Sequence, residues 1–204
     1  DDYARDSHAL TPYSGTPPGP YQLAVTVYRQ TDGAQLSAPI PIGAVTVTCP
    51  LQPPSLEPVT TLNAMLGPVT LLGVDWTVTS LNVGDNLAFT AYWDPLNGTD
   101  RRLVGQVNLI DTNGKVASSQ TLALVNDDYP TTAWRPGCPL RAPLDVRVPA
   151  TLTGGLYNVE LQVLDGSAAV GDAIALGGLT VHAPERSFEA PAYAPGMSPA
   201  PVRR

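Results

Sequence analysis

Cys49 and Cys138 are the two cysteines of this 204-residue chain, and neither lies in a CxxC or other metal-ligand spacing. The two thiols can stay free and buried, or they can form a disulfide, which a composition typical of cell-envelope proteins favours. Such a bond would close a loop of about ninety residues and stabilise the folded chain by roughly 4–5 kcal/mol in the chain-entropy model. We predict that it attaches the N-terminal region to the main domain.

His8 and His182 are the only histidines, and neither has partners at the spacing of a zinc site or a catalytic triad. Asn126, Asp127 and Asp128 offer oxygen ligands for Ca²⁺, but they match no calcium-loop pattern, and a solvated loop is the simpler interpretation. The sequence lacks a nucleophile elbow and a phosphate-binding loop. We therefore predict no catalytic residue, no metal site and no cofactor, and we expect that the protein is not an enzyme.

Aromatic side chains offer a different chemistry, because an exposed ring can stack on a sugar. The candidate carbohydrate contacts are Tyr92, Tyr129 and Trp134, and we expect the two tyrosines to be the more exposed. The competing interpretation, which we favour, places such rings in the core, with Trp134 anchoring a loop beside Pro136. Asn97 begins an Asn-Gly-Thr acceptor pattern for N-glycosylation. The same residues are also a plain turn between two strands, which is the favoured interpretation.

The composition indicates that strands and turns position these residues. The chain contains 22 prolines and only 14% charged residues, which argues against long helices. A net charge of −7 and a single lysine, Lys115, leave no cationic surface for nucleic acid or for an anionic membrane. No apolar run is long enough to cross a membrane as a helix, so we expect no direct membrane insertion. No signal peptide is visible, so any such peptide lies upstream or has been removed.

Alternation of apolar and polar residues predicts an all-β protein with an antiparallel β-sandwich. Asn113-Gly114 predicts a two-residue hairpin turn of the primed kind. One face of 87–93 and one face of 157–163 should lie in the core, because large apolar side chains occupy every second position. The expected strands are 21–28, 40–47, 69–72, 77–81, 87–93, 103–110, 116–125, 145–148, 157–164 and 174–181.

An internal similarity suggests how the chain is divided. Gly19–Val27 matches Gly155–Val163, and Ile42–Val47 matches Leu176–Val181. We interpret the match as a tandem repeat cut out of phase. Residues 1–50 are then the last two strands of one unit, 51–60 a Pro-rich linker, 61–182 a complete sandwich and 183–204 an extended Pro-rich tail. Two strands alone are marginal in water, so the first unit must pack on the main domain or be completed by another chain.

A series of short motifs across residues 60–190 carries a resemblance to a known family. The motifs are Leu71-Leu72-Gly73-Val74-Asp75, Val83-Gly84-Asp85-Asn86-Leu87, Tyr92-Trp93, Val107-Asn108-Leu109-Ile110-Asp111, Asn113-Gly114-Lys115-Val116, Tyr129-Pro130-Thr131, Trp134-Arg135-Pro136-Gly137, Val148-Pro149 and Gly155-Leu156-Tyr157. In this order they resemble the extracytoplasmic β-sandwich repeats that follow the membrane region of some bacterial glycosyltransferase-like multi-pass proteins.

The resemblance implies an Ig-like or jelly-roll sandwich outside the membrane, without catalytic activity of its own. Two residues depart from the family pattern. Cys138 stands where an acid is usual, which supports a disulfide particular to this protein, and Asn108 stands where a histidine is common. The membrane part is absent, so glycosyl transfer does not carry over.

These observations lead to two expected functions in an extracytoplasmic setting, whether secreted, cell-surface or periplasmic. The first is a non-catalytic structural or assembly module that engages protein partners, or copies of itself, through its N-terminal half-unit and its C-terminal tail. The alternative is a carbohydrate-binding module attached to a membrane glycosyltransferase or an envelope polymer. A hydrolase has no support beyond the presence of paired carboxylates.

Overall fold

The computed structural model describes residues 9–10, 12, 15–49, 57–76 and 78–183. His8, most of the expected linker and the tail from residue 184 lie outside these residues. Within them the protein is all-β, and its one helical element is the short 3₁₀ helix η1 (Thr131–Ala133). In the described part of the chain no helix is long and apolar enough to span a membrane.

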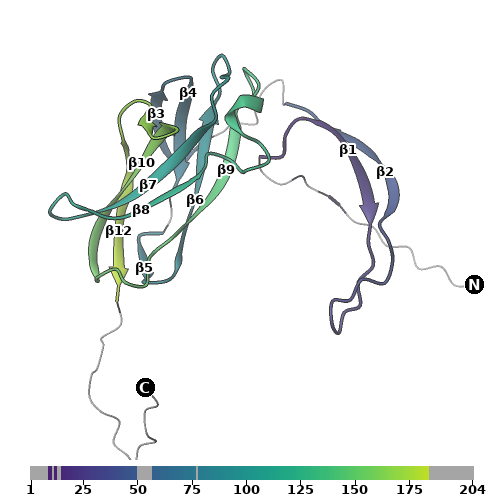
Figure 1. Cartoon of the computed structure of the whole chain (residues 1–204), viewed down its shortest axis with the longest axis horizontal. Helices are drawn as coiled ribbons and strands as arrows, with labels where there is room; N and C mark the ends of the chain where they lie inside the picture. Colours follow the sequence, from purple (N-terminus) through teal and green to yellow (C-terminus); the bar gives the residue numbers. More distant parts are fainter. Residues whose placement is uncertain (1–8, 11, 13–14, 50–56, 77, 184–204) are drawn as a thin grey trace, which may run out of the picture.

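Two sheets pack face to face to form the main β-sandwich (Figure 1). One sheet has the order β3 (Thr60–Leu66), β4 (Val69–Asp75), β6 (Asn86–Asp94), β9 (Leu140–Arg147). The other has the order β5 (Ser80–Asn82), β12 (Ile174–His182), β10 (Gly155–Asp165), β7 (Leu103–Asp111), β8 (Val116–Ala123), with β11 (Ala168–Ala169) paired to β10. Neighbouring strands are antiparallel except β5 and β12, which are parallel. The predicted all-β sandwich is therefore confirmed.

The core lies between these sheets, where the sequence placed it. Leu87, Phe89, Ala91 and Trp93 point inward from β6, and all are at most 4% exposed. The row Tyr157, Val159, Leu161 and Val163 does the same from β10. Burial of each large apolar side chain contributes roughly 1.5–3 kcal/mol, so these rows are a main source of the sandwich's stability.

Several strands differ from the expectation, among them β4, β5 and β11, and for β3 and β9 the reason is local. Strand β3 was not expected; its register shifts between Thr61 and Ala64, where Asn63 has a left-handed φ of 50°, so the bulge interrupts the alternation. Strand β9 begins at Leu140 rather than at residue 145. It contains Pro143, which a central strand would not tolerate, but β9 lies at the edge of its sheet, where a missing N–H costs no ladder hydrogen bond.

The hairpin between β7 and β8 forms where Asn113-Gly114 predicts it, but its turn differs in type. A type I′ turn needs positive φ at both central residues and a type II′ turn at the first, whereas only Gly114, the second of this pair, has one, 79°. The N–H of Gly114 donates to the carbonyl of Asp111 at 3.0 Å. The Asp111 carboxylate accepts from the N–H groups of Asn113 and Lys115, and these bonds hold the longer turn and lower the pKa of that carboxyl.

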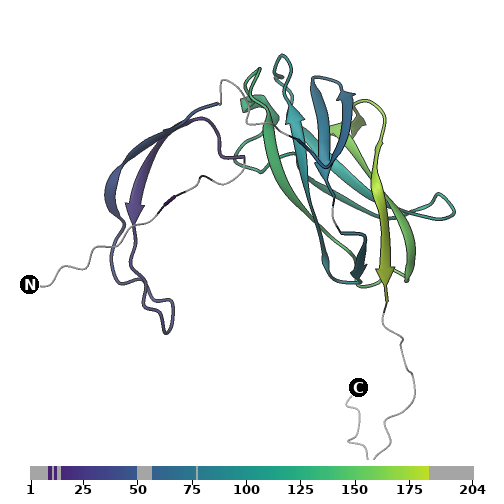
Figure 2. The ribbon, with the colours of Figure 1, turned by 180° about the vertical axis from the view of Figure 1, so that it is seen from behind.

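A third sheet stands apart from the sandwich. It is the hairpin of β1 (Gly19–Val25) and β2 (Ile40–Val47), and neither strand pairs with a strand of the sandwich. Figures 1 and 2 show it beside the end of the sandwich that carries η1, whereas β12 finishes at the opposite end. The two-stranded sheet and its attachment are therefore the part of the molecule that the sandwich itself does not explain.

Candidate functional site

The hairpin β1–β2 has the same strand register as β10–β12 in the sandwich. Gly19 pairs with Val47 as Gly155 pairs with Val181, and each register shifts once, after Leu23 in β1 and after Val159 in β10. These first residues differ by 136 positions and their partners by 134. The similarity seen in the sequence therefore extends to pairing and to the position of the bulge.

The tyrosine that opens each hairpin makes the same contact. The hydroxyl of Tyr21 donates to the carbonyl of Pro17 at 2.7 Å, and that of Tyr157 donates to the carbonyl of Thr153 at 2.8 Å, four residues upstream in both cases. A tyrosine bonded back to the chain before its strand is typical of the corner between the two sheets of a sandwich. The hairpin β1–β2 thus has the local geometry of a sandwich corner.

The two hairpins differ in what covers their apolar faces. In β10–β12 this face lies against the opposite sheet, whereas in β1–β2 it is open. The exposed fractions are 44%, 59% and 42% for Val25, Ile42 and Val45, against 0%, 5% and 1% for the corresponding Leu161, Leu176 and Leu179. We define the apolar side chains of β1–β2 on this side as the hairpin face; it comprises Tyr21, Leu23, Val25, Ile40, Ile42, Val45 and Val47.

A hollow of about 570 Å³ lies on the hairpin face. Its floor includes Tyr21, Leu23 and Val45, and Leu10 and Pro12 from the preceding segment border it. The lining is mainly apolar, and a volume of this size is within the range of roughly 300–1,000 Å³ that binding pockets occupy. The hairpin face is therefore a surface that can receive side chains from another element.

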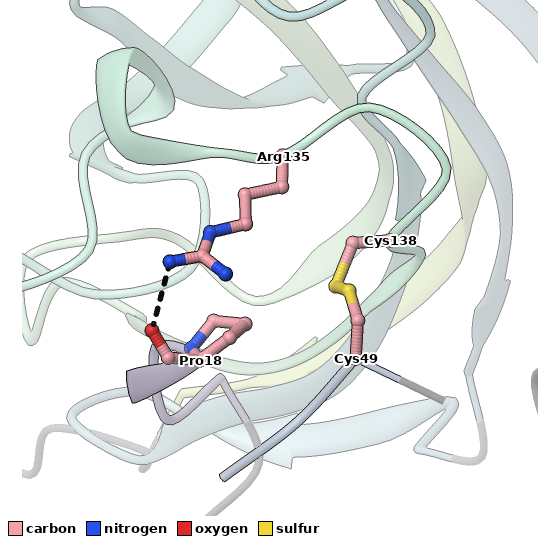
Figure 3. The surroundings of a disulfide bond; sticks show 4 residues. All are labelled: Pro18, Cys49, Arg135 and Cys138. Atoms are coloured by element: carbon pink, nitrogen blue, oxygen red, sulfur yellow. Dashed lines mark hydrogen bonds between the residues drawn. A yellow bond between two sulfur atoms is a disulfide. The ribbon is translucent and has the colours of Figure 1, made fainter. Parts of the chain in front are cut away.

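A disulfide between Cys49 and Cys138 holds the hairpin to the sandwich (Figure 3). Cys49 follows β2, and Cys138 lies between η1 and β9; their Cα atoms are 5.6 Å apart, an ordinary separation for this bond. The predicted disulfide is present, and neither of these cysteines is free. It closes a span of 89 residues that includes the strands β3–β8.

Hydrogen bonds accompany the disulfide at this junction. Nη2 of Arg135 donates to the carbonyl of Pro18 at 3.5 Å, as Figure 3 shows, and Nδ2 of Asn126 donates to the carbonyl of Gly15 at 3.2 Å. Gly15 has a φ of 80°, and a Cβ there would overlap the side chain of Val125, so this close approach requires glycine. The covalent bond is thus accompanied by hydrogen bonds and by close packing between the segment before β1 and the sandwich.

Tyr92, a candidate sugar contact, is 6% exposed and held between the strands that flank β6. Its hydroxyl donates to Oδ2 of Asp75 at 2.6 Å and accepts from Nε of Arg141 at 3.3 Å. Burial and the bond to the carboxylate raise the pKa of Tyr92. Burial alone would raise the pKa of Asp75, but the hydrogen bonds from Tyr92 and from the N–H of Val59, with the charge of Arg141, bring it below its ordinary value.

Tyr129 and Trp134, the other candidate sugar contacts, are 2% and 5% exposed. Nε1 of Trp134 donates to the carbonyl of Tyr129 at 3.0 Å, and its ring packs on Trp93 with centroids 6.2 Å apart. Burial raises the pKa of Tyr129. The cavity beside these rings measures about 40 Å³, far below the roughly 300 Å³ of a small binding pocket.

The expectation that Tyr92 and Tyr129 are exposed is wrong, because both fill space between neighbouring strands and loops. A sugar must reach the face of a ring to stack on it, and none of these three rings offers an open face. The interpretation of Trp134 as a loop anchor agrees with its hydrogen bond to Tyr129.

The remaining candidates lie at the surface. Asn97 is exposed in the turn between β6 and β7, where the N–H of Gly98 donates to the carbonyl of Pro95 at 2.7 Å. His182 ends β12, and its Nε2 lies 2.7 Å from Oγ of Ser80. Among the described residues, no group of three or more histidine, cysteine, aspartate and glutamate side chains is placed to hold a metal ion.

Comparisons with known proteins add little to this description. The sequence matches no protein-family model and no curated protein. Among solved structures, a similar chain is the alkylpurine DNA glycosylase AlkC of Pseudomonas fluorescens, bound to DNA containing an abasic site analogue. The two chains are 12% identical, and the match covers 56% of this chain and 30% of that chain at a TM-score of 0.30. A score this low does not establish a shared fold, so no function is transferred from it.

Proposed function

We propose that this protein is a non-catalytic structural module of an extracytoplasmic assembly, and that it contacts neighbouring protein through the hairpin face. The exposure of this face carries the proposal. Val25, Ile42 and Val45 are 42–59% exposed, although side chains at the same positions of β10–β12 are at most 5% exposed. Contiguous apolar surface of this kind marks interaction sites, because water is released when a partner covers it.

The open edges of the hairpin support the same role. Among the described residues, β1 pairs only with β2, so the backbone N–H and C=O groups along the outer edge of each strand have no strand beside them. An unpaired edge next to an apolar face favours the addition of strands from another element. The module thus offers a partner both main-chain hydrogen bonds and an apolar surface.

The disulfide supports the extracytoplasmic setting, because such bonds form and persist in oxidising compartments. It also gives the hairpin a defined attachment to the sandwich. The resemblance to repeats that follow the membrane region of glycosyltransferase-like proteins fits this setting and is itself a proposal. A glycan-binding function has no such support, because it rested on three side chains that are buried.

Association of the purified chain tests the proposed function. We expect sedimentation velocity to show association that grows from micromolar to millimolar concentration, because isolated molecules leave the hairpin face in water. Val45→Asp places a charge on this face and should abolish association. Ala44→Asp, the matched control, places the same charge on the opposite face of β2, at a residue that does not line the hollow, and should leave association unchanged. A wild-type chain that stays monomeric throughout the range would contradict the proposal.

A further inference from the structure

The hairpin β10–β12 shows which neighbours a hairpin of this kind has when its apolar face is covered. Strand β7 pairs with the edge of β10 that faces away from β12, and strand β5 pairs with the edge of β12 that faces away from β10. The four-stranded sheet lies against the apolar row. All of these neighbours come from the segment that precedes the hairpin, β3–β9. The same chain therefore contains a template for the missing neighbours of β1–β2.

We propose that β1–β2 is the closing hairpin of a second β-sandwich of the same kind, and that its natural partner is a protein segment equivalent to β3–β9. This inference rests on the proposed function and names the partner of the hairpin face. The shared register, the shared bulge and the shared tyrosine contact place β1–β2 in the same geometric class as β10–β12.

The side chains of the hairpin face would fill such a core without crowding. Tyr21 and Val47 match Tyr157 and Val181, each with the same residue type. The other exchanges preserve apolar character and nearly preserve volume, which is the kind of change that cores tolerate. Leu23 is one methylene larger than Val159, Val25 and Val45 are one methylene smaller than Leu161 and Leu179, and Ile42 is isomeric with Leu176.

One glycine indicates a feature of the partner. Gly177 of β12 is covered by the indole of Trp76, so close that a Cβ on Gly177 would lie 3.2 Å from Nε1. Gly43 occupies the same register position in β2, opposite Leu23, and a Cβ there would meet nothing within 4 Å. The partner should therefore carry a large flat side chain, equivalent to Trp76, that covers Gly43.

The segment before β1 follows the same correspondence. At the offset of 136 residues that relates Gly19 to Gly155, Leu10 and Pro12 correspond to Val146 and Val148. Val146 and Val148 belong to the sandwich core, and Leu10 and Pro12 border the hollow on the hairpin face. The correspondence in sequence thus extends back from β1 to the position of Val146 in β9.

The decisive experiment joins the chain from Ala9 onward to a copy of its own template. A copy of residues 57–144 is joined to Ala9, because the offset of 136 makes Ala9 the successor of Leu144; the copy carries Cys138→Ala to prevent mispairing. We expect amide hydrogen exchange in β1 and β2 to slow by at least about 100-fold relative to the unextended chain. Amides that are hydrogen-bonded within a folded sandwich exchange only when that whole sandwich unfolds. Val45→Asp in the extended chain should remove this protection, and Ala44→Asp should retain it.

A second engineered protein tests the same proposal in case the added copy does not fold. In it, residues 19–48 replace residues 155–182 of the intact protein, so that β3–β9 must accept the hairpin in place of β10–β12. A single cooperative urea transition, followed by tryptophan fluorescence, is the expected result. Success of either chain supports the proposal, and failure of both overturns it. If both chains fail but the wild-type protein associates and Val45→Asp abolishes that association, the proposed function stands and only this partner is wrong. Protection in the extended chain with a monomeric wild type would instead overturn intermolecular assembly and retain the partner.

Discussion

The hairpins β1–β2 and β10–β12 share register, bulge and tyrosine contact, yet one has its apolar row in water and the other has it in a core. The difference lies in the neighbours. The hairpin β10–β12 has strands on both edges and a sheet across its face, whereas β1–β2 has no strand of the sandwich beside it among the described residues and is attached through the disulfide and the hydrogen bonds near it. Local sequence thus determines how two strands pair, and the rest of the chain determines what that pairing contributes to stability.

Truncation of equivalent side chains should give the largest contrast between the two hairpins. Leu161→Ala removes a fully buried side chain and should lower the free energy of unfolding by about 2–5 kcal/mol. Val25→Ala, its counterpart, should change it by less than about 0.5 kcal/mol, because Val25 is 44% exposed and lies outside the core. Urea denaturation followed by tryptophan fluorescence measures both, since all three tryptophans lie in the sandwich region. Equal losses would mean that the hairpin face is already covered in the isolated protein.

Removal of the disulfide should have the next largest effect, because it is a covalent link between β1–β2 and the sandwich that β10–β12 does not need. The double variant Cys49→Ala, Cys138→Ala should lower the free energy of unfolding of the sandwich by roughly 2–4 kcal/mol. This is less than the full loop-closure value, because without the bond the hairpin of the folded protein regains conformational entropy, which offsets part of the loss. Reduction of the wild-type protein is the control and should lower the urea midpoint by a similar amount. An unchanged midpoint would show that the bond only tethers the hairpin.

The tyrosine contacts allow a matched test at single-atom scale. Tyr157→Phe removes the hydroxyl that donates to Thr153 and should cost about 1 kcal/mol in the unfolding of the sandwich. Tyr21→Phe removes the equivalent bond to Pro17 and should leave that transition unchanged, while amide exchange in β1 becomes faster. If Tyr21→Phe destabilises the sandwich as much, the two units unfold as one.

Acid should act on the sandwich through Asp75, with the smallest effect of the four. Its folded-state pKa is below the ordinary 3.8, so the stabilisation is complete above that pH and is lost as the pH falls through the lowered value. Tyr92→Phe removes a hydrogen bond to this carboxylate and should reduce the acid-induced loss by about 0.5–1 kcal/mol after allowance for solvent screening. Tyr28→Phe, on the exposed hairpin, is the control. The measurement is the urea midpoint across acidic pH. If the midpoints of both variants fall with pH as the wild-type midpoint does, the prediction is contradicted.

The sequence predicted those parts of the molecule that depend on alternation along one strand. The rows on β6 and β10 are buried as expected, because every second residue is apolar and the two strands are central in their sheets. Alternation fails where a bulge resets it, as at Asn63 in β3. Strand β9 does alternate, with every second residue from Leu140 to Val146 buried, but Pro143 argued against a strand there. The proline is tolerated because β9 lies at the edge of its sheet.

The candidate site depends on contacts between strands, which alternation does not determine. Tyr92 is next to a core residue and should face outward, but Asp75 and Arg141 on the flanking strands bond its hydroxyl and enclose it. The hairpin face has the reverse relation, because Val25 and Val45 have the pattern of core residues and lie in water. The internal similarity was the signal that identified these residues, since it supplied a covered counterpart for each.

The position of the disulfide has a mechanical consequence. A pull applied between the hairpin and the end of β12 would enter the sandwich at Cys138, because the bond from Cys49 is a shorter covalent route than the 89 residues between the two cysteines. Tension would then run through β9, β10 and β12 and bypass β3–β8. Under load, the strands β3, β4 and β6 of the four-stranded sheet would therefore carry no tension, and they could keep their structure while the rest of the chain bears the force.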